Sequence, residues 1–214
     1  MTTHSTLEIR SKEEVVDQLA SAAEGFYQRG WAFGTGGNFS ALVGRNPLRL
    51  LITASGVDKG KLNRTTFVLL NENGQLLEGC GKPSAETDLH YAIYNNTDAG
   101  AVLHTHSVWS TVLSQKYLQA GEIRIKGLEM LKGLSGVTTH QHEEVFPVLE
   151  NSQDIDALSE KVTGLFDKSP GIHAFLLSGH GLTTWGKTIE EARRHVEIIE
   201  FLLNVQAHRE LIGI

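Results

Sequence analysis

The sequence predicts an α/β fold in which a largely antiparallel central sheet is flanked by helices. Three observations support this prediction. Segments with helical spacing of apolar residues alternate with short apolar, β-branched runs; several of these runs are joined by hairpin-like turns; and the chain has no repeat, linker or low-complexity tract. With 214 residues, the chain is therefore expected to form a single domain over residues 1–214.

Two of the expected helices begin with a capping box. Residues 11–14 (Ser-Lys-Glu-Glu) open the first helix, which Gly30 is placed to end, and residues 188–191 (Thr-Ile-Glu-Glu) open a long closing helix. The apolar residues of each helix fall on one face. They are Val15, Val16, Leu19, Ala22, Ala23 and Phe26 in the first helix, and Ile189, Ala192, Val196, Ile199 and Leu203 in the last.

Three internal helices are also expected. Ser84 can cap a helix that runs to about Asn95, a helical pattern starts at Ser107, and another occupies residues 152–166. The residues expected to point inward are Leu89, Ala92 and Ile93 in the helix after Ser84, and Ile155, Leu158, Val162 and Leu165 in residues 152–166.

The expected strands are short and follow turn residues. Residues 48–56 (LRLLITASG) have the pattern of a strand that ends in a turn, and residues 65–79 (TTFVLLNENGQLLEG) that of a hairpin turning at Asn73-Gly74. Residues 99–106 (AGAVLHTH) form another strand. In residues 173–186 (HAFLLSGHGLTTWG), two strands flank a Gly-His-Gly turn. Residues 144–151 (EVFPVLEN) form a strand whose Pro147 indicates an edge or a bulge.

Composition and charge argue against several classes of partner. The formal net charge of −6 is spread along the chain without a cluster of Lys and Arg, so neither nucleic acid nor an anionic membrane surface is expected as a partner. No apolar run approaches the roughly 20 residues of a membrane-spanning helix, and the N-terminal segment is too polar for a secretory signal. The single cysteine, Cys80, fits a reducing compartment, so a cytoplasmic location is expected.

Three histidines have the spacing of metal ligands. Side chains alternate along a strand, so His104 and His106 should share a face about 7 Å apart. His180 lies in a turn between Gly179 and Gly181, which leave its imidazole exposed. Either motif alone also fits solvated residues at a strand end. Together they predict a three-histidine site with an open coordination position, suited best to Zn²⁺, with Fe²⁺, Mn²⁺ or Co²⁺ as alternatives.

The remaining histidines lack such a context, and most are expected on the surface or on helix faces. His140 and His142 repeat the spacing of His104 and His106, but in a polar, loop-like segment where contact with substrate or with the metal ligands is the functional alternative. The full set is His4, His90, His140, His142, His173, His195 and His208.

Three glycine-rich or small polar loops could bind a phosphate. They are residues 34–40 (GTGGNFS), 53–56 (TASG) and 82–86 (KPSAE). Exposed N–H groups and hydroxyls bind anions in such loops, and Ser84 and Ala85 would add the amides of a helix N-terminus. Neither a dinucleotide-binding fingerprint nor a Walker A loop is present. Each loop alone is best explained as an ordinary turn, but three of them beside a metal site indicate a small phosphorylated substrate.

In this order, these motifs resemble the class II aldolase/adducin family over nearly the whole chain. The matching segments are TGGNFS, ITASG, KPSAETDLHYAIY, AVLHTHS and LLSGHGLTTWG, followed by the long closing helix. The resemblance implies a three-layer α/β/α arrangement and a homotetramer with active sites at subunit interfaces. It also implies one Zn²⁺ held by His104, His106 and His180.

The family's functional residues carry over to matching positions of this sequence. The substrate phosphate would be held by Gly37, Asn38, Ser55, Gly56, Ser84 and Ala85. Glu86 matches the acid/base that lies beside the metal in the aldolases, and Glu129 matches the residue proposed as general acid/base in a dehydratase branch. Without the resemblance, Glu86 would be explained as a first-turn carboxylate favoured by the helix dipole, and Glu129 as a surface residue.

Within the family, three segments are most similar to the dehydratases that act on 5-methylthioribulose 1-phosphate. They are KGLEMLKGLSGVTTHQHEE, VFPVLENSQDI and WGKTIEEARRHVEIIEFL. The implied reaction removes the C3 proton and then the C4 hydroxyl, leaving a 2,3-diketone. Glu129, or failing that Glu86, would take the C3 proton, and Glu129 would protonate the departing hydroxyl. Burial beside Leu128 and Met130 is expected to raise the pKa of Glu129.

Two other functions remain open from the sequence. The same histidines and Glu86 would serve a sugar-phosphate aldolase or 4-epimerase, acting on a fuculose or ribulose phosphate, which breaks the C3–C4 bond. The adducin branch suggests a binding module without catalysis, although such a module would be expected to have lost the three ligands that this chain retains.

Overall fold

The computed structural model describes residues 11–214, and within them nine strands form one sheet. The strand order is β4-β3-β2-β1-β5-β9-β8-β7-β6. Neighbouring strands are antiparallel except β7 and β8, which are parallel. The prediction that there is no secretory signal was based on the N-terminal segment, most of which lies outside the described residues. His4 also lies outside them.

The elements follow one another as helices and strands in close alternation. Their bounds are α1 (Lys12–Gln28), β1 (Asn38–Arg45), β2 (Leu48–Thr53), η1 (Lys59–Lys61), η2 (Arg64–Thr66), β3 (Phe67–Asn71), β4 (Leu76–Glu78), α2 (Thr87–Asn96), β5 (Ala101–Thr105), α3 (Val108–Tyr117), β6 (Glu122–Lys126), η3 (Glu129–Gly133), β7 (Glu143–Leu149), α4 (Ile155–Lys168), β8 (Ala174–Leu177), β9 (Gly181–Gly186) and α5 (Ile189–Ile212).

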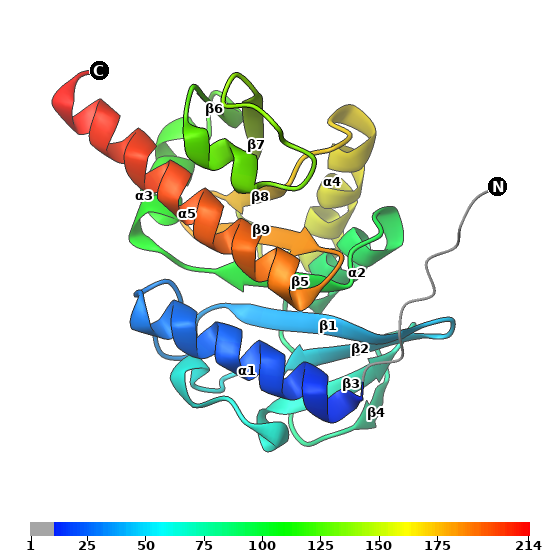
Figure 1. Cartoon of the computed structure of the whole chain (residues 1–214). Coiled ribbons are helices and arrows are strands. Elements are labelled where there is room, and N and C mark those ends of the chain that lie inside the picture. Colours follow the sequence, from blue (N-terminus) through cyan, green and yellow to red (C-terminus); the bar gives the residue numbers. More distant parts are fainter. Residues whose placement is uncertain (1–10) are drawn as a thin grey trace.

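Helices cover both faces of the sheet, which confirms the three-layer α/β/α prediction. On one face, α2 and α4 pack on alternate residues of β2, β3, β5, β8 and β9. On the other, α1 and the first part of α5 cover β1, β2, β3 and β5, while α3, η3 and the rest of α5 cover β6 to β9. Figure 1 shows α1 and α5 in front of the sheet, with α2 and α4 behind it.

The capping signals set the helix boundaries at both ends of the chain. The side chain of Ser11 accepts the Glu14 N–H, and the Glu14 carboxylate accepts the Ser11 N–H, as the capping box predicts. Thr188 caps α5 at the Glu191 N–H, but the Glu191 carboxylate turns back to the Lys187 N–H instead of the Thr188 N–H. All the apolar positions expected inward in α1 and α5 are buried.

Two local predictions are wrong, and two strands were not predicted. The helix expected from Ser84 begins at Thr87, and Glu86 occupies its N-cap position without a side-chain cap bond. Pro147 was expected at an edge or bulge, but β7 lies between β8 and β6, and Pro147 is in regular register opposite Glu122. The pairing of β7 with β8 starts one residue later, at Val148. The strands β1 and β6 were not predicted, and β6 rather than β7 is the edge strand at this end of the sheet.

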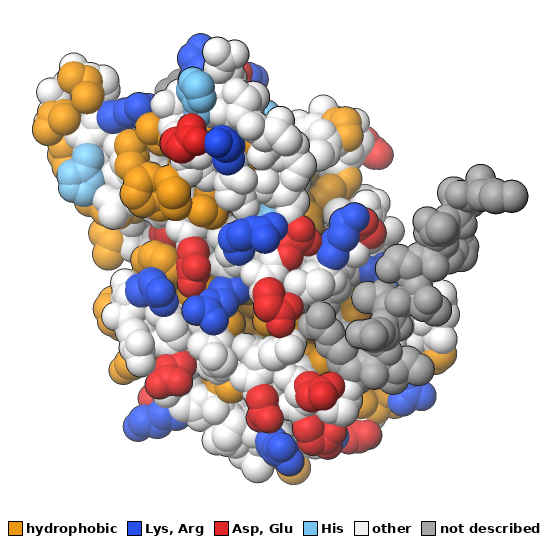
Figure 2. Space-filling view, viewed as in Figure 1, with side chains coloured by type: hydrophobic (Ala, Val, Ile, Leu, Met, Phe, Trp, Pro, Cys, Tyr) orange, Lys and Arg blue, Asp and Glu red, His pale blue; other side chains and the backbone are white. Residues whose placement is uncertain are grey.

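No helix among residues 11–214 combines the length and the apolar character that crossing a membrane requires. On the face drawn in Figure 2, lysines and arginines are interspersed with acidic side chains.

Candidate metal centre

Three imidazoles from distant parts of the chain converge at one point. His104 lies in β5, His106 follows that strand, and His180 lies in the turn between β8 and β9. Nε2 of His104 is 2.7 Å from Nε2 of His106 and 3.3 Å from Nε2 of His180. The candidate ligand atoms of all three lie within 4.8 Å of one another. The structure therefore brings together the three residues that the sequence predicted as a metal site.

Close backbone approaches make this convergence possible. A Cβ on Gly181 would lie 2.0 Å from the carbonyl oxygen of Thr105, and one on Gly36 would lie 2.9 Å from Nδ1 of His106. Gly179 has φ +67°, which favours glycine. The glycines around His180 thus permit both the tight turn and its contact with the end of β5.

The hydrogen bonds of His104 leave its Nε2 free to coordinate. Nδ1 lies 2.9 Å from the carbonyl oxygen of Leu182, which can only accept, so Nδ1 carries the hydrogen and Nε2 presents its lone pair. Burial, reinforced by neighbouring histidines, lowers the pKa of His106 to about 3 and also lowers that of His180. Neutral imidazoles with converging Nε2 atoms are a donor set that fits a divalent metal ion.

A carboxylate completes the cluster. Oε2 of Glu86 lies 3.4 Å from Nε2 of His104, and Oε1 lies 3.4 Å from Nε2 of His180. Burial alone would raise the pKa of Glu86, but His104, His180 and the side-chain amide of Asn38 outweigh burial and lower it to about 2. The site therefore presents the converging nitrogens of three imidazoles and one ionised carboxylate.

The three predicted phosphate loops lie side by side next to this cluster. The Ser55 N–H donates to the carbonyl oxygen of Lys82, which joins the second loop to the third. The Lys59 N–H, three residues after the second loop, donates to the carbonyl oxygen of Gly34 in the first loop. Gly37 adopts φ +82°, and a Cβ there would lie 2.6 Å from the carbonyl oxygen of His104. The first loop thus touches the metal-ligand strand directly.

Lys59, just after the second loop, is a charged residue that was not predicted as part of the site. Its side chain is 2 % exposed, and its ammonium donates to the carbonyl oxygens of Thr35 and Val57. Burial lowers the pKa of Lys59 to about 8. It follows a glycine turn and an aspartate in the sequence, a context that resembles an ordinary surface lysine.

The other residues predicted to bind phosphate differ in the main-chain and side-chain groups that they present to an anion. Gly56 is exposed with φ +74°. The side-chain amide of Asn38 is engaged by Glu86 and His90, so any phosphate contact from this residue would come from its main chain. Ser84 and Ala85 precede α2 and so do not supply its first-turn amides, because the helix starts at Thr87.

Glu129 lies apart from the histidine cluster in this chain. It is the first residue of η3, its side chain is 71 % exposed, and its partners are Lys132 at 2.6 Å and His140 at 3.7 Å. The hydrogen bond from Lys132 lowers its pKa. The expectation that burial would raise this pKa is therefore wrong for the single chain.

Several histidines expected on the surface or on helix faces take part in hydrogen-bond networks that are largely buried. His90 and His195 are 1 % and 3 % exposed. His142 and His173 both contact the buried carboxylate of Glu144, at 2.7 and 2.9 Å. Their burial depends on which elements pack together, and helical or strand spacing alone does not reveal this.

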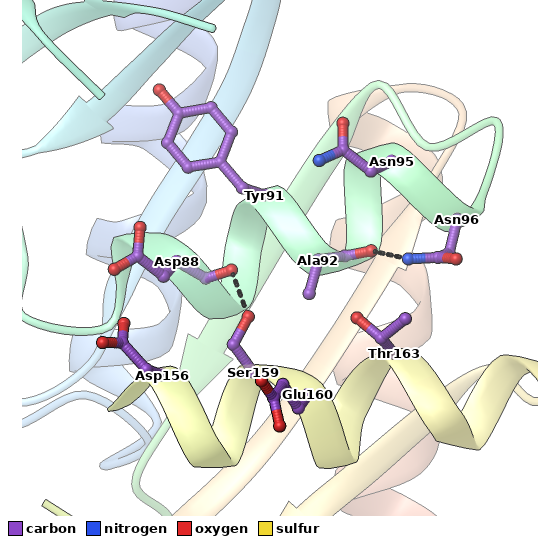
Figure 3. A pocket seen from close by; sticks show the side chains of 9 residues that line it. All are labelled: Asp88, Tyr91, Ala92, Asn95, Asn96, Asp156, Ser159, Glu160 and Thr163. Atoms are coloured by element: carbon purple, nitrogen blue, oxygen red, sulfur yellow. Dashed lines mark hydrogen bonds between the residues drawn. The ribbon is translucent and has the colours of Figure 1, made fainter. Parts of the chain in front are cut away.

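A groove of about 610 Å³ lies away from the histidine cluster, between α2 and α4. Figure 3 shows the carboxylates of Asp88 and Asp156 and the ring of Tyr91 along it. The sequence predicts a metal site at the converging imidazoles, and none of these residues lines the groove.

Known proteins are similar to this chain over most of its length. A chain named methylthioribulose-1-phosphate dehydratase from Sorangium cellulosum is 42% identical over 91% of this chain and 92% of its own length. A protein of the same name from Pectobacterium atrosepticum is 41% identical over 94% of this chain and 98% of its own length.

Solved structures of low sequence identity share the fold. An L-fuculose 1-phosphate aldolase matches with a TM-score of 0.79 and 21% identity, covering 97% of this chain and 91% of its own. The Thermus thermophilus enzyme of that name matches with a TM-score of 0.74 and 24% identity, covering 94% and 98%. The family model described as Class II Aldolase and Adducin N-terminal domain matches residues 17–207. The chain is therefore a member of the class II aldolase and adducin family.

Proposed function

We propose that this protein is a Zn²⁺-dependent hydro-lyase that dehydrates 5-methylthioribulose 1-phosphate to 5-methylthio-2,3-dioxopentyl phosphate, a step of methionine salvage. The observation that carries the proposal is the convergence of His104, His106 and His180 beside Glu86 and three anion-binding loops. The two relatives named above, about 40% identical over nearly the full length, support this choice of substrate.

The three histidines would hold the ion through their Nε2 atoms. When bound, a divalent ion supplies Lewis-acid stabilisation of the negative charge that develops on the substrate's oxygens. The chain's own contribution is to aim these imidazoles at one point. The bond between Nδ1 of His104 and the carbonyl oxygen of Leu182 fixes the ring orientation of the most buried ligand.

The phosphate of the substrate would lie against the loops that contain Gly37, Ser55, Gly56 and Ser84. Their backbone N–H groups are the expected donors. The ammonium of Lys59, buried beneath the first two loops, would add positive charge to this pocket. The substrate's C2 and C3 oxygens would then face the histidines.

Two carboxylates can move the protons of the reaction. Glu129 is our first choice to take the C3 proton and to return a proton to the departing C4 hydroxyl, and Glu86 is the second choice for the first step. Glu129 needs a neighbouring subunit to bring it to a site, since its partners in its own chain are Lys132 and His140.

We therefore also propose a homotetramer of single-domain chains with active sites at subunit interfaces. A pocket of about 510 Å³ between α3, α5 and η3 is bordered by Val108, Met130 and Phe201, whose side chains are exposed. Figure 2 shows hydrophobic side chains gathered over η3 and the C-terminal half of α5. Association through this region would bury these apolar side chains and change the surroundings of Glu129.

A cytoplasmic location completes the proposal. A sugar-phosphate substrate and a lone cysteine, Cys80, which is exposed and free, both fit a reducing compartment.

A second function, sugar-phosphate aldolase or 4-epimerase, is favoured by one observation. Glu86, which matches the aldolase acid/base, lies 3.4 Å from two of the histidines, whereas Glu129 is exposed. The two functions differ in the bond they break, so their products separate them.

The deciding experiment offers metal-loaded protein three substrates: 5-methylthioribulose 1-phosphate, fuculose 1-phosphate and ribulose 5-phosphate. Formation of the diketone by loss of water from the first supports the dehydratase. Release of dihydroxyacetone phosphate or glycolaldehyde phosphate, or interconversion of ribulose phosphate with its C4 epimer, would support the second function instead. No turnover of any substrate by protein with a full metal complement would contradict both.

A further inference from the structure

A chain of buried hydrogen bonds leads from the metal centre into the space between α2 and β1. Glu86 accepts from the amide of Asn38 at 2.6 Å, and the carbonyl oxygen of that amide lies 2.5 Å from Nε2 of His90. On the far side of the ring, Nδ1 of His90 lies 2.6 Å from Oγ of Ser40, which lies 2.8 Å from the hydroxyl of Tyr94. The side chains of His90, Ser40 and Tyr94 are at most 1 % exposed.

The spacing of these residues explains how α2 and β1 together form this row of hydrogen bonds. Glu86, His90 and Tyr94 recur every four residues, so they follow one face at the start and along the length of α2. Asn38 and Ser40 are two residues apart on β1, so they point to the same face of the sheet. The two rows interleave where that face of the helix meets the strand.

The donor and the acceptor of each hydrogen bond in this row can be assigned by starting from Glu86. The carboxylate of Glu86 only accepts, so the NH₂ group of Asn38 faces it and the amide oxygen faces His90. Nε2 of His90 must then carry the hydrogen. Because burial keeps this ring neutral, Nδ1 accepts from Ser40, whose oxygen in turn accepts from Tyr94.

We infer that His90 is a positioning residue that, through Asn38, fixes the Glu86 carboxylate against the three-histidine centre. Turning the Asn38 amide over would place its oxygen 2.6 Å from a carboxylate oxygen and its NH₂ group against the Nε2–H of His90. Both contacts are repulsive, so the hydrogen on Nε2 locks the amide. The locked amide in turn holds Oε2 of Glu86 at its 3.4 Å separation from His104.

The inference rests on the metal site of the proposed function, and metal binding without substrate tests it. In His90→Gln, the side-chain amide reaches the place of Nε2 and can still donate to Asn38. In His90→Asn, the shorter amide reaches only the place of Nδ1. The matched control is Tyr91→Phe, which removes a part-buried hydrogen bond of α2, from the Tyr91 hydroxyl to the carbonyl oxygen of Asn71, that is not connected to Glu86.

Co²⁺ affinity, measured by competition with a chromogenic chelator, and the visible spectrum of bound Co²⁺ are the readouts. Outer partners of metal sites typically change affinity or activity roughly 10- to 100-fold. We expect His90→Asn to weaken Co²⁺ binding by about that factor and alter its spectrum. His90→Gln should recover most of the affinity, and Tyr91→Phe should match the wild type even where its melting temperature falls.

Equal Co²⁺ affinity and an unchanged spectrum in folded His90→Asn would overturn the inference, as would equal losses in the Gln and Asn variants. If His90→Asn does not fold, Ser40→Ala tests the far side of the ring, with a loss of about threefold or more expected and an unchanged affinity counting against the inference. Wild-type protein that binds Co²⁺ but does not dehydrate the substrate would instead contradict the proposed function alone.

Discussion

The Nε2 atoms of His104 and His180 lie 3.3 Å apart although 76 residues separate them in the chain. Two imidazole nitrogens at this distance, with that of His106 at 2.7 Å from the first, need a shared hydrogen or a shared cation between them. The hydrogen bond from Nδ1 of His104 to the Leu182 carbonyl removes one way to supply such a hydrogen. A metal ion is the simplest cation that satisfies all three nitrogens.

Replacing His180 by Ala is expected to weaken Zn²⁺ or Co²⁺ binding by more than about 100-fold, because loss of a direct ligand should exceed the effect of outer partners. In the wild type, chelation should lower the melting temperature, since a ligand that binds only the folded state stabilises it. His208→Ala, which changes an exposed histidine of α5, is the control for both measurements. Retention of a full metal equivalent by His180→Ala would rule out this ligand set.

Replacing Glu129 by Gln is expected to lower kcat for the dehydration by about 10²- to 10⁴-fold, the usual worth of a general acid/base. Metal content should not change, and the melting temperature should change little, because the side chain is exposed in its own chain. Steady-state kinetics together with elemental analysis check this, with Glu13→Gln on α1 as the control. Near-normal turnover of metal-loaded Glu129→Gln would indicate that Glu86, and not Glu129, is the general acid/base.

Local patterns predicted those parts of the fold that local physics determines. The six inward residues of α1 follow from apolar spacing between a capping box and Gly30, and all six are buried. The hairpin at Asn73-Gly74 likewise follows from its turn residues, and β3 and β4 do pair. Such features depend on a few neighbouring residues and so can be derived without knowing the sheet order.

Features that depend on the sheet order were missed. The parallel pairing of β7 with β8 arises because α4 crosses between them, and Pro147 is tolerated inside the sheet because pairing with β8 begins only at Val148. The burial of His90 has the same origin. Its spacing from Glu86 puts both on one face of α2, but only the packing of α2 on β1 brings them to Asn38.

Glu200 provides a pH-dependent test of the packing behind the metal-ligand strand. Its carboxylate is 3 % exposed and accepts from Oγ1 of Thr105, which lies between two of the histidine ligands. Burial raises its pKa to about 7. A raised carboxyl pKa gives stability that is complete below the unfolded value of 4.5 and is lost as the pH rises to about 7.

Glu200→Gln keeps the shape and an acceptor but cannot ionise. Relative to the wild type, its free energy of unfolding should therefore rise between pH 5 and pH 8, by at most about 3 kcal/mol. Urea denaturation of both proteins at unit steps of pH measures this difference, in which the other titrating groups cancel. A difference that stays constant over that range would show that Glu200 ionises in the folded protein as it does in the unfolded chain.

His173 holds the segment that carries Glu129 and should do so as an imidazolium. Nδ1 lies 2.9 Å from the carboxylate of Glu144, and Nε2 lies 2.8 Å from the carbonyl oxygen of Ser135, so both nitrogens must donate. Burial alone would lower the pKa of His173, but Glu144 and the Ser135 carbonyl outweigh it and raise the pKa above 6.5. The stabilisation is thus complete below pH 6.5 and is lost as the pH rises through the folded value.

His173→Gln keeps one donor and removes the charge. It should destabilise the protein by about 3 kcal/mol at pH 6, the usual cost of breaking a buried pair, and by less at a pH above the folded pKa of His173, where the wild type has lost the charge too. Hydrogen exchange should quicken around Ser135 in the variant. A destabilisation that is the same at both pH values would mean that His173 is neutral, and the segment would then be held by its other contacts, such as the Ser135 N–H to Nε2 of His195.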